Sequence, residues 1–125
     1  MKRIISTPDA PKAIATYSQA VEANGMLFIS GQIAIDPSSG ALVGGGIEGQ
    51  TRQVMKNIGA ILNAAGYSYA DVIKTSCLLS NMDNYSLVNS IYGSFFPENP
   101  PARAAYAVSG LPMGALIEIE TIACH

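Results

Sequence analysis

One arginine, Arg103, stands in an otherwise apolar segment near the C-terminal end of the chain. We expect residues 102–109 to form a strand, in which alternation puts Arg103, Ala105 and Ala107 on one face. These small neighbours leave open space around the guanidinium. Because a guanidinium is a planar fork of N–H donors, it suits a carboxylate, which it can bind through two parallel hydrogen bonds. The segment therefore predicts a binding site for a small carboxylic acid.

Two glutamates, Glu118 and Glu120, lie two residues apart in the apolar run 115–123. In a strand this spacing places both carboxylates on one face, and a carboxylate that is half-buried there needs a partner. The pattern alone leaves two interpretations open. Either Arg103 and one glutamate form a structural or interfacial ion pair, or Arg103 anchors a substrate while a glutamate orients water.

Residue content disfavours several common kinds of site. The only histidine, His125, is the last residue of the sequence, which removes histidine-based nucleophilic catalysis and ordinary zinc ligation unless the terminus folds into a site. Cys77 and Cys124 match neither a zinc motif nor a Cys-x-x-Cys pair, so we interpret them as reduced, small apolar residues. The three glycines at 44–46 lack the Lys-Ser/Thr of a phosphate loop and are interpreted as a loop before a helix. We expect no metal and no cofactor.

Length and charge set further limits. The 125 residues fit one domain, 1–125. Charged residues make up 13%, about half of the roughly 25% in an average domain, so we expect other subunits to cover part of the apolar surface. The net charge is −2 and the seven basic residues are scattered, which disfavours nucleic-acid binding, since that binding needs a basic patch. No segment resembles a signal peptide or a membrane helix, so we expect a cytoplasmic protein without a membrane partner.

The remaining pattern describes the elements that must position these residues. Asn24-Gly25 between two strand-like runs is the strongest short-range signal for a hairpin. Besides the two strands above, the expected strands are residues 2–5, 17–23, 26–35 and 72–80.

Two amphipathic helices are expected. The first covers 47–65 and ends at Gly66, and Gly59 inside it predicts close packing on a sheet. The second covers about 83–96, with Asn81 or Asp83 as its cap. The apolar stripe of the first helix is Val54, Met55, Ile58, Ile61, Leu62 and Ala65. That of the second is Leu87, Val88, Ile91 and Phe95.

The order of these elements predicts an α+β domain. Two helices cover one face of a sheet of about six strands, which leaves the other face bare. A bare apolar face is unstable in water, so we expect subunits to associate through it.

The sequence resembles the RidA/YjgF family (reactive intermediate/imine deaminase A) along nearly its whole length. The segment around Arg103, followed by Leu111-Pro112 and Ile117-Glu118-Ile119, has the family's residues and spacing. The other matching segments are Tyr17–Ala20, Ile29–Gln32, Asn57–Ile58, Ala64–Gly66, Val88–Asn89, Tyr92 and Phe95–Pro97.

The resemblance implies a chorismate-mutase-like fold, with three subunits packing their sheets into a central barrel and active sites in clefts between neighbours. It implies a hydrolase that converts 2-enamine and 2-imine intermediates such as 2-aminoacrylate, released by pyridoxal-phosphate enzymes, to 2-keto acids and ammonia without a cofactor. A non-catalytic trimeric module that binds 2-keto acids or other small carboxylates stays open as an alternative. Nucleic-acid or ribosome interaction, also proposed for some members, is a third class.

Residue by residue, the resemblance gives Arg103 the role of binding the substrate carboxylate and Glu118 that of positioning or activating water. Ala105 matches a position that contacts the substrate through its backbone. The other pocket-lining matches are Tyr17, Ser30, Gly31 and Asn89. For three of these residues a purely structural role stays open. Tyr17 could pack in a subunit interface, Ser30 could hydrogen-bond to the backbone of its own strand or turn, and Asn89 could be a polar residue on a helix.

The chain departs from the family at two places. Ala15-Thr16 replaces a common Gly-Pro before Tyr17. This difference predicts that the loop carrying Tyr17 lies in a different position. Met113 stands where a lysine is common, and because it falls in a turn we expect little effect on the chemistry.

Overall fold

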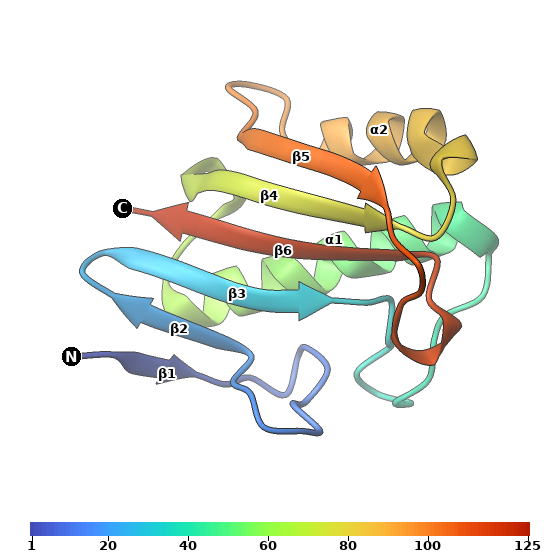
Figure 1. Cartoon of the computed structure of the whole chain (residues 1–125). Coiled ribbons are helices and arrows are strands. Elements are labelled where there is room, and N and C mark those ends of the chain that lie inside the picture. The colour runs from blue at the N-terminus through green and yellow to red at the C-terminus, as the bar shows by residue number, and fades with distance from the viewer.

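Six strands form one sheet in the order β1-β2-β3-β6-β4-β5, and two helices lie behind it (Figure 1). The structure, a computed structural model, describes residues 1–125. All neighbouring strands run antiparallel except β4 and β5, which are parallel. The predicted α+β order is confirmed. The strands are β1 (Arg3–Ile5), β2 (Ala20–Ala23), β3 (Met26–Gln32), β4 (Val72–Leu79), β5 (Ala102–Ala107) and β6 (Ile117–Cys124).

The predicted hairpin joins β2 to β3. Asn24 and Gly25 have φ values of 53° and 74°, as a two-residue hairpin turn requires. Both strands are shorter than expected, because β2 begins only at Ala20 and β3 ends at Gln32. After β3, the buried Asn57 side chain donates to the carbonyls of Ile33 and Ile35, and before β2, the Ser30 hydroxyl donates to the Ser18 carbonyl.

The longer helix, α1 (Gly46–Ala65), buries its whole predicted stripe, and Gly66 ends it in the left-handed conformation with φ 84°. The sequence predicted that Gly59 packs closely on the sheet, and this prediction was wrong. A Cβ there would meet the hydroxyl of Tyr69, not the sheet, and that hydroxyl donates to the Met55 carbonyl at 2.7 Å.

The shorter helix, α2 (Tyr85–Ser94), follows a 3-10 turn over Met82–Asn84. The Asn81 side chain caps this turn by accepting the Asp83 N–H at 2.8 Å. Leu87 was wrongly assigned to the buried stripe, since it is 43% exposed while Tyr92 is buried. Both positions are apolar, so periodicity alone did not fix which faces inward. Neither helix has the length and apolarity needed to cross a membrane.

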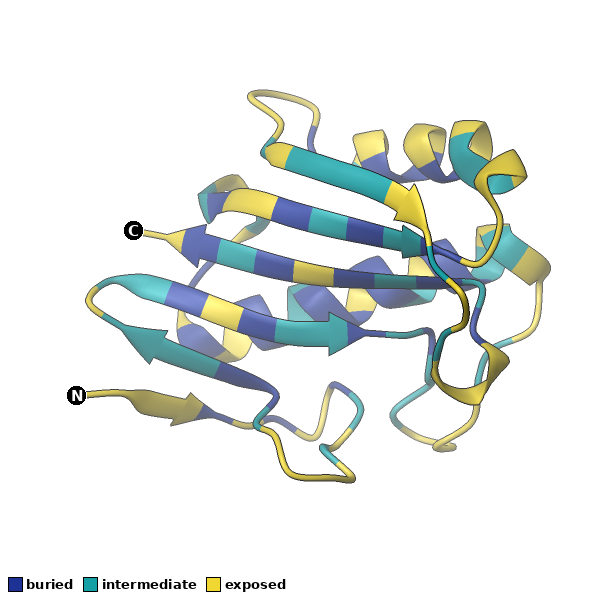
Figure 2. Ribbon diagram, in the orientation of Figure 1, coloured by how far each residue is buried: buried dark blue, intermediate teal, exposed yellow.

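The two faces of the sheet differ in cover. Buried and exposed residues alternate along β4 and β6, with the buried ones under the helices (Figure 2). The opposite face, here called the open face, exposes Ile4, Phe28 and Tyr106 at 51%, 46% and 51%. The structure thus has the bare apolar face that the sequence predicts. A side chain's face therefore decides whether it meets α1 and α2 or lies on the uncovered side of the sheet.

Candidate active site

Arg103 lies on β5, at one edge of the sheet, and faces the helices. It is in register with Thr75 of parallel β4, and the buried Thr75 hydroxyl is hydrogen-bonded to the Tyr92 hydroxyl of α2 at 2.7 Å. Side chains in register point to the same face. Arg103 therefore lies on the side of the sheet that α2 covers.

Two tyrosines hold the guanidinium. Arg103 Nη2 donates to the Tyr85 hydroxyl at 2.7 Å. Its Cζ lies 4.9 Å from the ring centre of Tyr92 and 5.4 Å from that of Tyr85. The prediction of open space around the guanidinium was wrong, because α2 supplies aromatic neighbours. Only one guanidinium N–H is engaged by a side chain, so the fork keeps donors for a carboxylate.

The surroundings of Arg103 are otherwise small or polar. Ala105 packs partly buried against the core, in register with Cys77. Burial raises the pKa of Cys77 to about 11 despite the nearby Arg103 charge, so this thiol is not a ready nucleophile. Asn89 is exposed on α2, one turn after Tyr85.

Glu118 belongs to a second group of predicted residues, on the open face. It lies on β6 beside Leu78 of β4 and lines a cavity of about 300 Å³. Three of the four residues assigned to pocket lining, Tyr17, Ser30 and Gly31, line this same cavity. The fourth, Asn89, does not. His125, by contrast, packs against Tyr67 with ring centres 4.0 Å apart and ring planes tilted by 54°, and it is not among the lining residues.

A β-bulge shapes the Glu118 side of the cavity. The register between β3 and β6 shifts so that Ser30 and Gly31 together oppose Glu120. A Cβ on Gly31 would overlap the Glu118 carboxylate, so the absent side chain is what lets that carboxylate pack there. The Ser30 hydroxyl donates to the Ser18 carbonyl at 2.6 Å, which supports its plainer role of serving nearby backbone.

Glu118 is half-buried and unpaired. No hydrogen bond or ion pair engages its carboxylate, and the ion pairs of the chain are Arg3–Glu22 and Arg52–Glu48. Burial raises the pKa of Glu118, and the neighbouring Glu120 charge raises it further. A carboxylate with a raised pKa in a cavity suits proton transfer with water.

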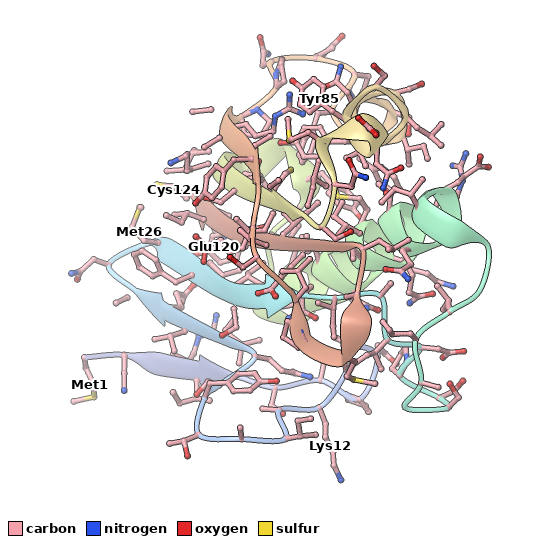
Figure 3. All side chains as sticks on the ribbon, turned by 45° about the vertical axis from the view of Figure 1, so that its right-hand side comes forward. Met1, Lys12, Met26, Tyr85, Glu120 and Cys124 are labelled. Carbon is pink, nitrogen blue, oxygen red and sulfur yellow. The ribbon has the colours of Figure 1, made fainter.

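The structure rules out an ion pair between Arg103 and Glu118 within one chain. Glu118 opposes Leu78, which opposes Tyr106 on β5, three residues beyond Arg103. The two residues are therefore roughly 10 Å apart along the strands and roughly 10 Å apart across them, on opposite faces. In Figure 3, Tyr85, whose hydroxyl accepts from Arg103, lies at the top of the molecule and Lys12, which lines the cavity, lies at the bottom.

Three buried amides brace the segments that line the cavity. Gln19 accepts from the Thr7 N–H at 2.7 Å and donates to the Pro11 carbonyl at 2.8 Å. Asn57 of α1 donates to the carbonyls of Ile33 and Ile35 at 3.2 and 2.9 Å. Gln50 of α1 accepts from the Leu116 N–H at 2.9 Å. Each segment is thus tied to the interior by a side chain that the sequence analysis did not single out.

Sequence reasoning also missed residues with a direct place in the site. Tyr85 and Tyr92 contact Arg103, and a signal for Tyr85 was present, since it precedes Asn89 by four residues on one helix face. Lys12 and Met113 line the Glu118 cavity. Met113 was expected to matter little, but its turn borders the cavity.

Comparison with known proteins identifies the family. The family described as Endoribonuclease L-PSP matches residues 7–125. The chain belongs to the RidA/YjgF/L-PSP family. The human 2-iminobutanoate/2-iminopropanoate deaminase is 50% identical over 123 residues, which cover 98% of this chain and 90% of the human one.

Solved structures of Rid proteins share the fold. A conserved Rid family protein of Yersinia pestis has a TM-score of 0.98 and 49% identity, over 100% of both chains. The E. coli TdcF structure with bound serine has a TM-score of 0.94 and 35% identity, over 98% of both chains. The RidA-like fold predicted from the sequence is confirmed.

Proposed function

We propose that this protein is a 2-iminobutanoate/2-iminopropanoate deaminase, which hydrolyses reactive imines and enamines to 2-keto acids and ammonia. The observation that carries the proposal is the pair of prepared half-sites. One holds an arginine with free donors between two tyrosines, and the other holds an unpaired carboxylate with a raised pKa in a cavity. Relatives at about this level of identity bear the deaminase name.

The half-sites meet between two copies of the chain. Arg103 and Glu118 occupy opposite faces of one sheet, so one chain does not present both to a small substrate. Arg103 lies on β5, an edge strand that a second copy can approach, and the open face needs a partner. The closed trimer that the resemblance implies satisfies both needs, with Arg103 from one subunit and Glu118 from its neighbour.

Hydrolysis follows from these positions. Arg103 holds the carboxylate and fixes the imine carbon, which lowers the entropic barrier to attack by water. Because β5 is an edge strand, the backbone on its outer side is unpaired, and a carbonyl at Ala105 accepts the N–H of the protonated imine. Glu118 takes a proton from water as its oxygen bonds to the carbon. Glu118 returns that proton to the nitrogen and then takes the proton of the hydroxyl group as the carbon–nitrogen bond breaks, which releases ammonia and the 2-keto acid.

A binding module for small carboxylates would use the same Arg103. The unpaired Glu118 argues against it, because a carboxylate in the cavity repels an anionic ligand and gives a module without turnover no benefit. Nucleic-acid cleavage, which the family description names, finds little support. Lys12 is the one basic residue among the lining residues, and the net charge is −2.

Subunit complementation tests the proposal. An amino-acid oxidase supplies the imino acid while semicarbazide competes for it, and an active deaminase suppresses semicarbazone formation. We expect R103A and E118Q each to be inactive while keeping the oligomeric state of the wild type. The two variants are then co-expressed with different tags and purified through both tags, so that only mixed trimers remain. We expect about a third of wild-type activity, because each mixed trimer has one of its three sites with both residues intact.

Two results would contradict these statements separately. Mixed oligomers without restored activity would contradict a site that takes Arg103 from one subunit and Glu118 from its neighbour. A wild-type protein that suppresses no semicarbazone with several imino acids, yet binds 2-ketobutyrate in calorimetry, would be a binding module instead.

A further inference from the structure

The walls of the Glu118 cavity are largely apolar. The cavity has about 300 Å³, a volume that corresponds to roughly ten water molecules in the liquid. Three of its apolar side chains are substantially exposed in the chain: Ile14 at 76%, Met113 at 55% and Tyr17 at 49%. Ile33 and Ile35 add to the same wall. The cavity therefore offers apolar surface that is still to be covered.

Met113, which lines this wall, has an uncommon backbone conformation. In the turn Pro112–Gly114 it has φ 58° and ψ 21°, the left-handed region that residues with side chains rarely adopt. The turn is fixed by the Ala115 N–H donating to the Pro112 carbonyl at 3.0 Å and by the Gln50 bond to Leu116. Strained residues held by their surroundings cluster at functional sites.

The chemistry of the cavity decides which part of an imino acid it takes. Glu118 carries the negative charge there, and the one cationic lining residue is the exposed Lys12. A substrate carboxylate is therefore disfavoured in this cavity, while Arg103 offers it a prepared fork. The reacting carbon must lie beside Glu118, so what remains for the apolar wall is the substrate's side chain.

We propose, on the basis of the deaminase function above, that this wall binds the side chain of 2-imino acids with extended apolar chains. Met113 sets the preferred length. Its thioether is unbranched and flexible, so it adapts to straight aliphatic chains. The substrate class thus includes imino acids longer than 2-iminobutanoate.

A chain-length series tests this inference. Imino acids generated from alanine, 2-aminobutyrate, norvaline and norleucine are compared by semicarbazide competition. Wild-type kcat/KM rises about fourfold with each methylene that the wall buries. M113K places a charge on the wall and lowers the ratio of kcat/KM for the norleucine-derived imine to kcat/KM for 2-iminopropanoate about tenfold or more.

Two further variants separate specificity from folding. M113G suits the positive φ, so it folds without strain, and it flattens the chain-length dependence as M113K does. L87A, which removes an exposed apolar side chain of α2 outside the lining residues, keeps the wild-type profile. A flat or falling profile in the wild type, or M113K and M113G profiles equal to it, overturns this inference and leaves the deaminase function intact. A wild type without activity on any imine defeats the function itself.

Discussion

Glu118 is prepared for proton transfer by the residues that surround it. Burial disfavours its charged form, Glu120 repels that charge, and no donor stabilises it. A base must be ionised to accept a proton from water, so activity is lost as pH falls through the raised pKa of Glu118. The lower pH limit of turnover therefore reports on this one carboxylate.

E120Q tests that dependence. Removing the Glu120 charge lowers the pKa of Glu118, so the acidic limb of the kcat profile moves to lower pH. The shift is partial, because burial is the larger cause. A pH–rate profile on one imino acid measures it, with E98Q as the control, since Glu98 is an exposed residue on a loop outside the lining residues. An unchanged limb would remove Glu118 from the role of base.

G31A tests the packing of the same carboxylate. The added methyl group overlaps the Glu118 carboxylate, the movable end of a side chain, so the protein folds but the carboxylate is displaced. A displacement of about 1 Å costs on the order of 100-fold in rate. We expect kcat to fall by that order while thermal stability changes little. G110A, at a glycine whose Cβ meets nothing, is the matched control. Wild-type kcat in G31A would show that the position of Glu118 is not critical.

Among the secondary-structure elements, α1 does more than cover the sheet. Asn57 and Gln50 on its buried face reach the backbone of two cavity-lining segments, while Gln19 holds a third. The helix that forms the core is thus also the frame of the cavity. The shape of the site is coupled to the stability of the fold.

N57A tests this coupling. The substitution leaves the carbonyls of Ile33 and Ile35 without their buried donor, which costs about 1–3 kcal/mol of unfolding free energy. Chemical denaturation measures the loss, and a reduced kcat in the folded variant would show that the wall has loosened. N63A on the exposed side of α1 is the control, with a change within about 0.5 kcal/mol. Equal stability of both variants would contradict the bracing role.

Sequence patterns predicted elements better than relations between elements. Asn24-Gly25 and the stripe of α1 depend on neighbours in the chain, and both predictions were confirmed. Alternation correctly gave Arg103 its companions within β5. It gave no information on whether that face is the one Glu118 shares, because this depends on the pairing registers of three strands. The bulge at Gly31 and the amide braces are likewise set by contacts between distant segments.

For the whole molecule, the open face is the main apolar surface that no other part of the chain covers. Phe28 lies between Val21 and Ile122 in adjacent strands and is 46% exposed. Apolar side chains contiguous across several strands typically mark an association surface. The composite site proposed above makes this surface a condition for activity.

F28E tests that condition. A charge in the middle of the apolar face opposes association, so we expect the variant to run as a monomer in size-exclusion chromatography with light scattering. Activity is lost although Arg103 and Glu118 are unchanged. L87E, at an exposed apolar residue on α2 (43%), keeps the assembly and the activity. An active monomeric F28E would contradict the composite site.

The placement of Arg103 and Glu118 on opposite faces has a genetic consequence. In the proposed ring, each subunit lends its arginine to one neighbour and its glutamate to the other. A subunit damaged at both residues therefore silences two sites, where an enzyme with self-contained sites would lose one. In a cell that expresses a damaged and an intact allele, such a subunit depresses activity below the level set by gene dosage. An allele damaged at one residue is milder, because its remaining half still completes a neighbour's site.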